Sequence, residues 1–294
     1  MASRLSVWAG RLRPRGRGVQ ADPVSILADP SPRRRWETAA ALARSPVERD
    51  EIITLVGALA DKEPFVRWQA GRTLASLGSR PALEALLPAL RTPPVARQAA
   101  AAEALGSLGD RQATPALLEA ARSHHVGLRV SAIEALGRIG ATGAGPLLME
   151  MLRDESAGVR RAAARALGQV PDGAAEDALL VRLGDSQEHV LVRRAAAWAL
   201  ADSAPSGSAV RQLTKSLDDP DPQVRWYAAR SLGLAGDAAV GDEVMAALLT
   251  HADDTGQALQ GEVSQAVGLT MRRLQRRRRW RKVFPSRIRS TAGG

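Results

Sequence analysis

A repeated pattern of hydrophobic and polar positions runs along most of the chain. Its clearest copy is the segment VRRAAARALG, residues 159–168. The copies align on one leucine every 31–33 residues, at Leu42, Leu74, Leu105, Leu136, Leu167, Leu200 and Leu232. A fixed period of this length is typical of stacked repeats, in which each unit buries its apolar face on its neighbours. The pattern therefore predicts a repeat array, which can extend over 294 residues without one large core.

Each repeat is expected to contain a first helix, a turn and a second helix that carries the repeated segment. Aromatic residues make up only 3% of the chain, and this composition favours helices over strands. Proline near helix starts and glycine near helix ends mark the boundaries, the glycines being Gly78, Gly109, Gly140 and Gly236. The predicted first helices are residues 47–60, 80–90, 113–122, 143–152, 174–183, 208–217 and 240–249. The predicted second helices are residues 32–44, 64–77, 95–108, 127–139, 157–170, 190–202, 222–235 and 256–274.

The faces of the second helix follow from a rotation of about 100° per residue. Counted from the repeat leucine, positions −8, −4, 0 and +3 cluster on one side, as in Val159, Ala163, Leu167 and Val170. These positions are predicted to form the core. Position −4 is alanine in six copies and lets adjacent helices approach closely; the copies are Ala70, Ala101, Ala132, Ala163, Ala196 and Ala228.

These repeats resemble the HEAT-repeat family, in particular the short HEAT-like repeats also found in phycobilisome lyases. The resemblance covers about residues 22–269 and implies an all-α fold, a right-handed α-solenoid of about eight helix-pair repeats. Residues 1–21 then form a basic N-terminal arm and residues 270–294 a basic C-terminal tail. Two copies depart from the pattern: the first has Arg34 where a core Val belongs, and the third places Arg97 at −8 and Gln98 at −7. We expect these departures to change only the local geometry.

An arginine recurs at position −7, turned toward the edge of the core, in Arg35, Arg67, Arg129, Arg160, Arg193 and Arg225. Turn acids precede most of these arginines, namely Asp29, Asp61, Asp154, Asp185 and Asp219. The resemblance implies an Asp–Arg ladder that ties repeat to repeat, because each partly buried guanidinium needs an acceptor. We interpret these residues as structural rather than as ligand-binding.

Positions −6 and −2 point away from the core, and in a HEAT-like array the second helices line the concave face. The pairs at these positions are Trp36/Ala40, Trp68/Arg72, Ala99/Glu103, Val130/Glu134, Arg161/Arg165, Arg194/Trp198 and Trp226/Arg230. Four of the six tryptophans lie on this concave stripe, and Trp and Arg dominate interface hot spots. The predicted partner-binding residues are Trp36, Trp68, Arg72, Arg161, Arg165, Arg194, Trp198, Trp226 and Arg230. The alternative is that the tryptophans pack between repeats while the arginines solvate the helices.

The later half of the stripe, from Arg161 to Arg230, is predicted to be positive, which favours a protein partner with an acidic or anionic segment. The formal net charge of the whole chain is +10. The two ends carry this excess, because residues 21–269 hold 26 basic and 31 acidic side chains, a net charge of −5.

The C-terminal tail is predicted to bind an anionic surface. Its candidate residues are Arg272, Arg273, Arg276, Arg277, Arg278, Arg279, Trp280, Arg281 and Lys282. Three partners compete for it: an anionic membrane surface, nucleic acid phosphate, or an acidic protein surface.

Other sequence features limit the location and class of the protein. No apolar run approaches the ~20 residues of a membrane-spanning helix. Residues 1–18 lack a continuous apolar segment, so a secretory signal is not expected, and a transit peptide ranks below a bacterial basic arm. The absence of cysteine excludes disulfides and thiolate chemistry. The expected location is the cytoplasm, with peripheral attachment at the inner membrane face.

The sequence predicts no catalytic, cofactor or metal site. The histidines are His124, His125, His189 and His251. His125 and His189 each precede a repeat arginine by four residues, but they lie about 20 Å apart at ~10 Å per helix layer. The chain lacks the His-Glu pairs of deoxyhypusine hydroxylases and the aromatic-plus-Asp pocket of HEAT-like alkyl-DNA glycosylases. The glycines are explained as helix-end caps rather than phosphate loops.

The function predicted from these features is a non-enzymatic scaffold or assembly subunit that binds a partner protein on its concave face. The alternative is a solenoid that binds nucleic acid. A lower alternative, suggested by the repeat subtype, is a lyase-like chaperone for cofactor attachment.

Overall fold

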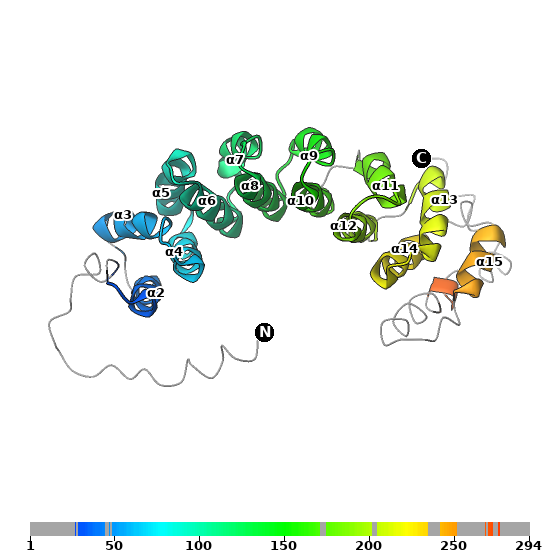
Figure 1. Ribbon diagram of the computed structural model, residues 1–294, viewed down its shortest axis with the longest axis horizontal. Helices are drawn as coiled ribbons and strands as arrows, with labels where there is room; N and C mark the ends of the chain where they lie inside the picture. The colour runs from blue at the N-terminus through cyan, green and yellow to red at the C-terminus, as the bar shows by residue number, and fades with distance from the viewer. Residues whose placement is uncertain are drawn as a thin grey trace, which may run out of the picture.

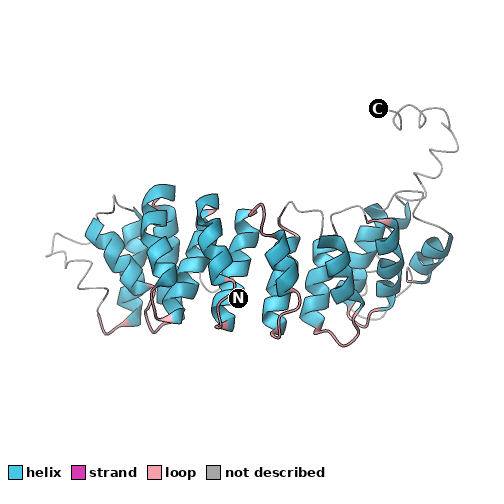
Figure 2. Cartoon of the chain, turned by 90° about the horizontal axis from the view of Figure 1, so that it is seen from above, coloured by secondary structure: helices cyan, strands magenta, loops and turns pink. Residues whose placement is uncertain are grey.

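A computed structural model of the chain describes residues 27, 29–44, 47, 49–170, 175–201, 205–234, 242–251, 268, 270–272 and 276. Over these residues the secondary structure is helical, and no strand occurs among them. Figure 1 shows the helices following one another along an arc, and Figure 2 shows them standing side by side in a row. The predicted all-α solenoid is confirmed.

The second helices line the inner, concave side of the arc (Figure 1). They are α2 (Pro32–Ala41), α4 (Pro64–Ser76), α6 (Val95–Leu108), α8 (Val126–Ile139), α10 (Ala157–Leu167), α12 (Val190–Leu200) and α14 (Pro222–Leu234).

The first helices form the outer row, and within the described residues six complete pairs run from α3/α4 to α13/α14. The outer helices are α3 (Arg49–Ala58), α5 (Ser79–Arg91), α7 (Thr114–Ala120), α9 (Gly145–Met151), α11 (Glu176–Gly184) and α13 (Gly207–Lys215), and α15 (Asp242–Thr250) follows α14. Short 3₁₀ turns extend some of the helices: η2 (Leu42–Arg44), η3 (Arg111–Ala113) and η5 (Ser216–Asp218).

The helix boundaries agree closely with the sequence pattern in the second helices. The range predicted for α6 is confirmed at both ends, and α8 begins one residue earlier than predicted. Most first helices are shorter than predicted, although α5 is one residue longer at each end. Helix α9 begins at Gly145 rather than at residue 143, because Gly143 has a φ of +85° that no helix accommodates. The predicted helix 256–274 falls mostly outside the described residues.

The core lies between the two rows of helices and follows the predicted positions. The alanines at position −4 are all fully buried, and so are Leu74, Leu105, Leu136 and Leu232. Arg34 replaces the core Val at the start of α2 and is exposed, paired with Asp29 at 3.3 Å. The departure in the first repeat is therefore local, as expected.

Several glycines of the repeated segment have a role that the sequence analysis did not assign. A Cβ on Gly106 would lie 2.7 Å from Cα of Ala135, and a Cβ on Gly137 would lie 2.9 Å from Cα of Ala166. A Cβ on Gly168 would likewise lie 2.9 Å from Cα of Ala199. Gly109 and Gly140 do cap helices, in the left-handed conformation. The interpretation of all the glycines as helix-end caps was wrong, because those at position +1 let neighbouring second helices touch backbone to backbone.

The part of the chain that the structure describes contains no helix long and apolar enough to cross a membrane.

Candidate partner-binding face

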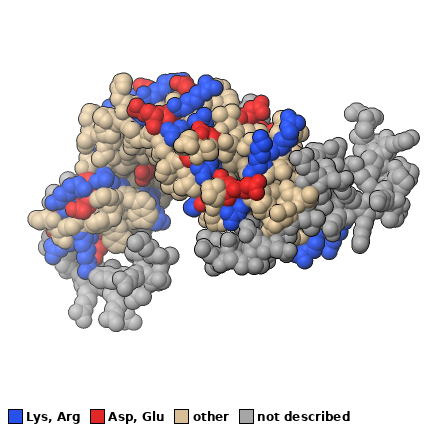
Figure 3. All heavy atoms as spheres, turned by 45° about the vertical axis from the view of Figure 1, so that its right-hand side comes forward, with Lys and Arg blue, Asp and Glu red and all other residues tan. Residues whose placement is uncertain are grey.

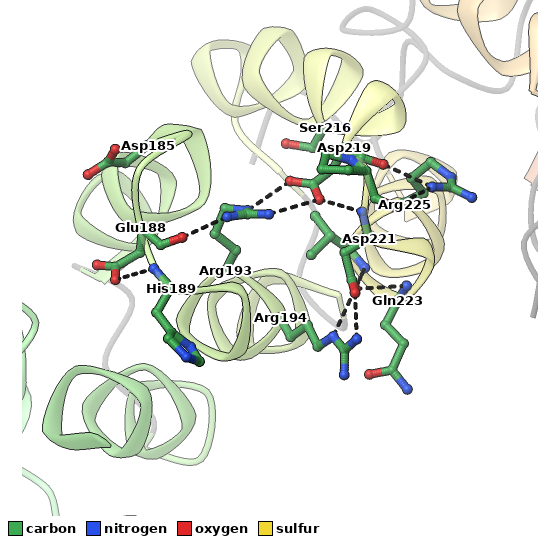
Figure 4. A network of polar contacts seen from close by, with 12 residues as sticks. Asp185, Glu188, His189, Arg193, Arg194, Ser216, Asp219, Asp221, Gln223 and Arg225 are labelled. Carbon is green, nitrogen blue, oxygen red and sulfur yellow. Dashed lines mark hydrogen bonds and ion pairs between the residues drawn. The ribbon is translucent and has the colours of Figure 1, made fainter. Parts of the chain in front are cut away.

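The arginines at position −7 form a ladder along the turn edge of the second helices. Arg193 of α12 donates to Asp219 from Nε at 2.9 Å and from Nη2 at 3.3 Å, and its Nη1 donates to the carbonyl of Glu188 at 2.7 Å (Figure 4). One guanidinium therefore links the turn before its own helix to the turn of the next repeat. The other rungs of this turn ladder are Arg35–Asp61, Arg129–Asp154 and Arg160–Glu188. The structural interpretation of these arginines agrees with the geometry.

One rung of the ladder uses a different acid from the one expected. The carboxylate of Asp185 accepts a hydrogen bond from the backbone N–H of Gln187, so it organises its own turn. Arg160 pairs instead with Glu188, from Nε at 2.8 Å and from Nη2 at 2.7 Å. Asp185 was therefore wrongly expected to serve as the rung.

The ladder is interrupted around α6. Nη1 of Arg67 donates to the carbonyls of Asp61 and Lys62, at 2.7 and 3.1 Å, and no carboxylate among the described residues pairs with it. Arg97 donates to the carbonyl of Pro93 at 2.8 Å, and its Nε is buried without a partner. The one-residue slip of the third repeat thus removes a rung while the core register of α6 is kept, since Ala101 and Leu105 are fully buried.

Two of the rung acids, Asp61 and Glu188, stay ionised well below neutral pH. Burial by itself would raise the pKa of the Asp61 carboxyl, but hydrogen bonds from Arg35 and from the backbone N–H of Glu63 outweigh burial and lower it. The pKa of Glu188 is lowered in the same way, with burial opposed by Arg160 and by the N–H of His189. Correspondingly, the hydrogen bond to Glu188 raises the pKa of Arg160.

The concave stripe is aromatic and open at its N-terminal end. Trp36 on α2 is 36% exposed, and Trp68 on α4 is 50% exposed. Cζ of Arg72 lies 4.7 Å from the ring centroid of Trp68, at cation–π distance. Phe65, at the start of α4, is also exposed. The structure thus presents large aromatic surfaces to solvent on two adjacent second helices.

Farther along the stripe the tryptophans are half-buried. Arg165 of α10 lies over the ring of Trp198 of α12, with Cζ 5.0 Å from the centroid, so this pair bridges two repeats. Trp226 packs against the core and against Tyr227, and Arg230 lies 5.6 Å from its ring centroid. Trp198 and Trp226 therefore largely fit the alternative interpretation, in which the tryptophans pack between repeats.

Two of the predicted binding arginines are close to carboxylates. Arg194 donates to both carboxylate oxygens of Asp221, at 2.9 and 2.5 Å, and the Asp221 side chain is 8% exposed (Figure 4). Nη2 of Arg161 lies 3.6 Å from Glu134 of the preceding second helix. The expected positive charge of the later half is therefore partly balanced within the fold. Figure 3 shows basic and acidic side chains interspersed over the side of the molecule that faces the viewer.

Asp221 is a partner of the predicted binding residue Arg194 that sequence reasoning missed. It ties α12 to α14 through Arg194 and also accepts the backbone N–H groups of Gln223 and Val224 at the start of α14. Burial opposes these bonds, but Arg194 and the N–H groups lower the pKa of the Asp221 carboxyl. The signal in the sequence was its place just before the proline that opens α14, where a capping acid is common.

The tail prediction is only partly covered by the structure. Arg272 and Arg276 are helical and exposed. Arg273, Arg277, Arg278, Arg279, Trp280, Arg281 and Lys282 lie outside the described residues, as do residues 1–21. The binding roles of the tail and of the concave stripe stay predictions.

Two of the histidines, His189 and His251, make side-chain contacts within the fold. Nδ1 of His189 accepts the N–H of Leu191 at the start of α12, and His251 lies 3.1 Å from Asp218. Among the residues that the structure describes, no three His, Asp or Glu side chains come together as a metal site.

Comparisons with known proteins bear on the fold. A family model for HEAT repeats matches residues 22–102, 95–167, 145–208 and 186–268. No curated protein sequence matches the chain significantly. Among solved structures, the complex of CpcE and CpcF of phycocyanin lyase from Nostoc sp. PCC7120 is similar at 25% identity, with a TM-score of 0.44, over 90% of this chain and 98% of that chain.

Two other solved structures are more similar in shape and more distant in sequence. YIBA_ECOLI is 19% identical, with a TM-score of 0.57, over 84% of this chain and 98% of that chain. Kap95p, from a structure that includes RanGDP, is 13% identical, with a TM-score of 0.69, over 91% of this chain and 44% of that chain. These similarities concern the fold alone.

Proposed function

The chain belongs to the HEAT-repeat family, and from this premise we propose that it is a non-enzymatic scaffold that holds a partner protein on its concave face. Solenoids of this kind present extended concave surfaces, and their function depends on the side chains displayed there. The proposed partner carries a segment with apolar and acidic side chains.

The observation that carries this proposal is the exposure of Trp36 and Trp68 on adjacent second helices. A soluble array has no structural need to leave two indole rings in water, and exposed aromatic surface marks interaction sites. Arg72 over Trp68 adds a cation beside the aromatic surface. Trp and Arg together are the residues most enriched in interface hot spots.

Arg165 and Arg230 are the basis for expecting acidic side chains in the partner segment. Each lies over a half-buried tryptophan, Trp198 or Trp226, and is itself exposed. Arg161 and Arg194 contribute less, because Glu134 and Asp221 already neutralise them. The proposal therefore places most of the binding energy on Trp36, Trp68 and Arg72, and the acidic preference on Arg165 and Arg230.

The test is a tagged pull-down from the native host, with the wild type compared with a Trp36→Ala, Trp68→Ala, Arg72→Glu triple variant. The control is Ile53→Ala on the outer helix α3, where Ile53 is 61% exposed. A captured protein should be lost from the triple variant and kept by the control. Its affinity, then measured with purified proteins, should fall by at least ~30-fold, because hot-spot residues each contribute 2 kcal/mol or more.

The competing function is nucleic acid binding through the basic tail. It predicts eluates with a high ratio of absorbance at 260 to 280 nm that collapses as salt is raised, because phosphate contacts release counterions. Such eluates, together with equal protein capture by wild type and triple variant, would refute the scaffold proposal.

A further inference from the structure

The outer face carries a second row of ion pairs, which link successive first helices. Arg91 at the end of α5 pairs with Glu119 of α7 at 2.8 Å, and Arg122 after α7 pairs with Glu150 of α9 at 3.3 Å. The two outer rungs share the same separation along the chain, because each arginine and each glutamate occupies an equivalent place in its repeat.

The next outer rung lacks its carboxylate. Arg153 follows α9 as Arg122 follows α7, and Val181 of α11 occupies the place that Glu150 takes in α9. The register of α9 and α11 is fixed by their buried leucines, Leu152 and Leu183, each of which lies two residues before the turn acid. A valine therefore stands where the preceding rungs have a glutamate, and no carboxylate among the described residues pairs with Arg153.

A groove opens at this incomplete rung. It has a volume of about 390 Å³ and lies between α9 and α11, with Met149, Leu152 and Val181 among its apolar lining and Arg153 and Arg182 in its wall. Val181 is 58% exposed, so an apolar side chain reaches solvent where the two preceding repeats have Glu119 and Glu150. The volume falls at the lower end of the ~300–1,000 Å³ range of ligand sites.

The charges of the groove favour a negative occupant. Glu150 also lines it, but its carboxylate is engaged by Arg122. Nη1 of Arg182 lies 3.4 Å from Glu188, a carboxylate that already accepts two hydrogen bonds from Arg160, at 2.8 and 2.7 Å. A guanidinium has five N–H donors, so Arg182 retains donors for a further carboxylate.

We propose that this outer groove binds a partner protein segment that inserts a large apolar side chain between α9 and α11 and completes the rung with an Asp or Glu. The carboxylate lies between Arg153 and Arg182, and the apolar side chain covers Val181. This surface is on the outer row of helices, so the proposal is independent of the concave face.

The experiment uses a phage-displayed library of random twelve-residue peptides, selected on the full-length protein. Enriched peptides should carry Asp or Glu next to a large apolar residue. Their affinity is then measured for the wild type and for Arg153→Glu, which replaces one of the two cations of the groove with an acid. Binding should fall about tenfold or more in this variant, because the new carboxylate repels the acidic side chain of the peptide.

Two further variants test the contribution of Val181 and the specificity of the charge change. Val181→Thr makes the exposed wall of the groove more polar at nearly the same side-chain volume and should weaken binding by a smaller factor. Arg111→Glu makes the same charge change at an exposed arginine in η3 and should leave binding unchanged. The concave triple variant should also bind the peptides normally, so failure of the concave proposal would be seen separately.

Three results would overturn the inference. The first is a set of enriched peptides that bind Arg153→Glu as tightly as the wild type, and the second is a selection that enriches no peptide. Octanoate is titrated in parallel, because it offers the same carboxylate and apolar chemistry in a small molecule. The third result is octanoate binding that Arg153→Glu abolishes, in the absence of any enriched peptide. This result would assign the groove to a free acid instead.

Discussion

At the scale of single residues, an arginine in the turn ladder joins two repeats because its five donors are divided between them. In Arg193 the Nη1 atom bonds the turn before its own helix, while Nε and Nη2 bond the acid of the next turn. A lysine could not replace it, because a single ammonium cannot present a planar fork to a carboxylate and reach a separate carbonyl. This explains why arginine recurs at position −7.

The ladder makes stability sensitive to acid. The pKa values of Asp61, Glu188 and Asp221 are lowered in the folded state from ordinary values of 3.8, 4.5 and 3.8. A carboxylate with a lowered folded pKa stabilises the fold above its ordinary value and loses this contribution as the pH falls through the folded pKa. The free energy of unfolding, measured by urea titration with circular dichroism, should stay level down to about pH 5 and then fall.

Glu188→Gln is the matched variant for this measurement. It should be destabilised at neutral pH by about 3 kcal/mol, because Arg160 loses the charge of its buried partner. Its stability should also fall less steeply below about pH 5, since one of the titrating groups is gone. An acid profile as steep as that of the wild type would show that Glu188 does not contribute.

The identity of each acid partner was harder to predict than the ladder itself. Periodicity located the arginines, but the turn before α12 contains both Asp185 and Glu188, and the path of the turn decides which carboxylate reaches Arg160. Similarly, the helical wheel placed Arg194 on the open stripe without revealing that Asp221 comes to meet it. Exposure predicted from one helix does not include side chains that arrive from the next repeat.

At the scale of elements, the distance between second helices is set by small residues on both partners. The glycine at position +1 of one helix faces an alanine of the next, as in Gly106 and Ala135. The first helices pack against the core through larger side chains, such as Leu87 and Leu118. Successive repeats are therefore closer together along the inner row of helices than along the outer row, and the arc in Figure 1 bends toward the inner row.

Replacing one of these glycines by alanine should destabilise the protein despite better helix propensity. In Gly106→Ala the new methyl would lie 2.8 Å from Cβ of Ala135. Overpacking of this kind costs ~1–3 kcal/mol, against a propensity gain of up to about 1 kcal/mol, so a net loss of about 1–2 kcal/mol is expected.

The control is Gly57→Ala in α3, where a Cβ would have no neighbour within 4 Å. This variant should gain about 0.5–1 kcal/mol from propensity alone. Both values come from chemical denaturation. Equal effects of the two substitutions would show that the helices do not meet closely at Gly106.

The helices themselves were predictable because the repeated segment combines a helical period with capping residues. The +1 glycines were misread because one of them, Gly168, stands at the end of its helix, where capping is the usual explanation. The additional signal was the small residue that faces each of them one repeat later, and recognising it requires the packing of two helices rather than the pattern of one.

At the scale of the whole molecule, the contacts between repeats differ along the array. The turn ladder connects α2 to α4 and continues from α8 to α14. Between these stretches, α4 and α6 are joined by apolar packing around Gly71, and α6 and α8 by close packing at Gly106 and a hydrogen bond from Ser131 to Glu103. The concave stripe is divided in a similar way. Exposed aromatic rings lie at its N-terminal end, and half-buried tryptophans paired with arginines lie at its C-terminal end. A partner would therefore bind in one direction only.

Amide hydrogen exchange should follow this arrangement. Helix α8 is packed closely on both sides, through Gly106 against Ala135 and Gly137 against Ala166, and its amides should exchange most slowly. Helix α2 has no preceding first helix among the described residues and should exchange fastest among the second helices. Mass spectrometry of peptides covering α2 and α8 measures both, and similar protection of the two would contradict this expectation.

The interruption of the turn ladder around α6 also has a mechanical consequence. A force applied to the two ends acts on every seam in series, and a seam closed by a directional ion pair stays stiff until its hydrogen bonds break. A seam closed by non-directional apolar contact can slide while most of its buried area is kept. In mechanical terms the molecule is a row of unlike springs, and the flexing needed to fit a partner is concentrated where α4 and α6 meet.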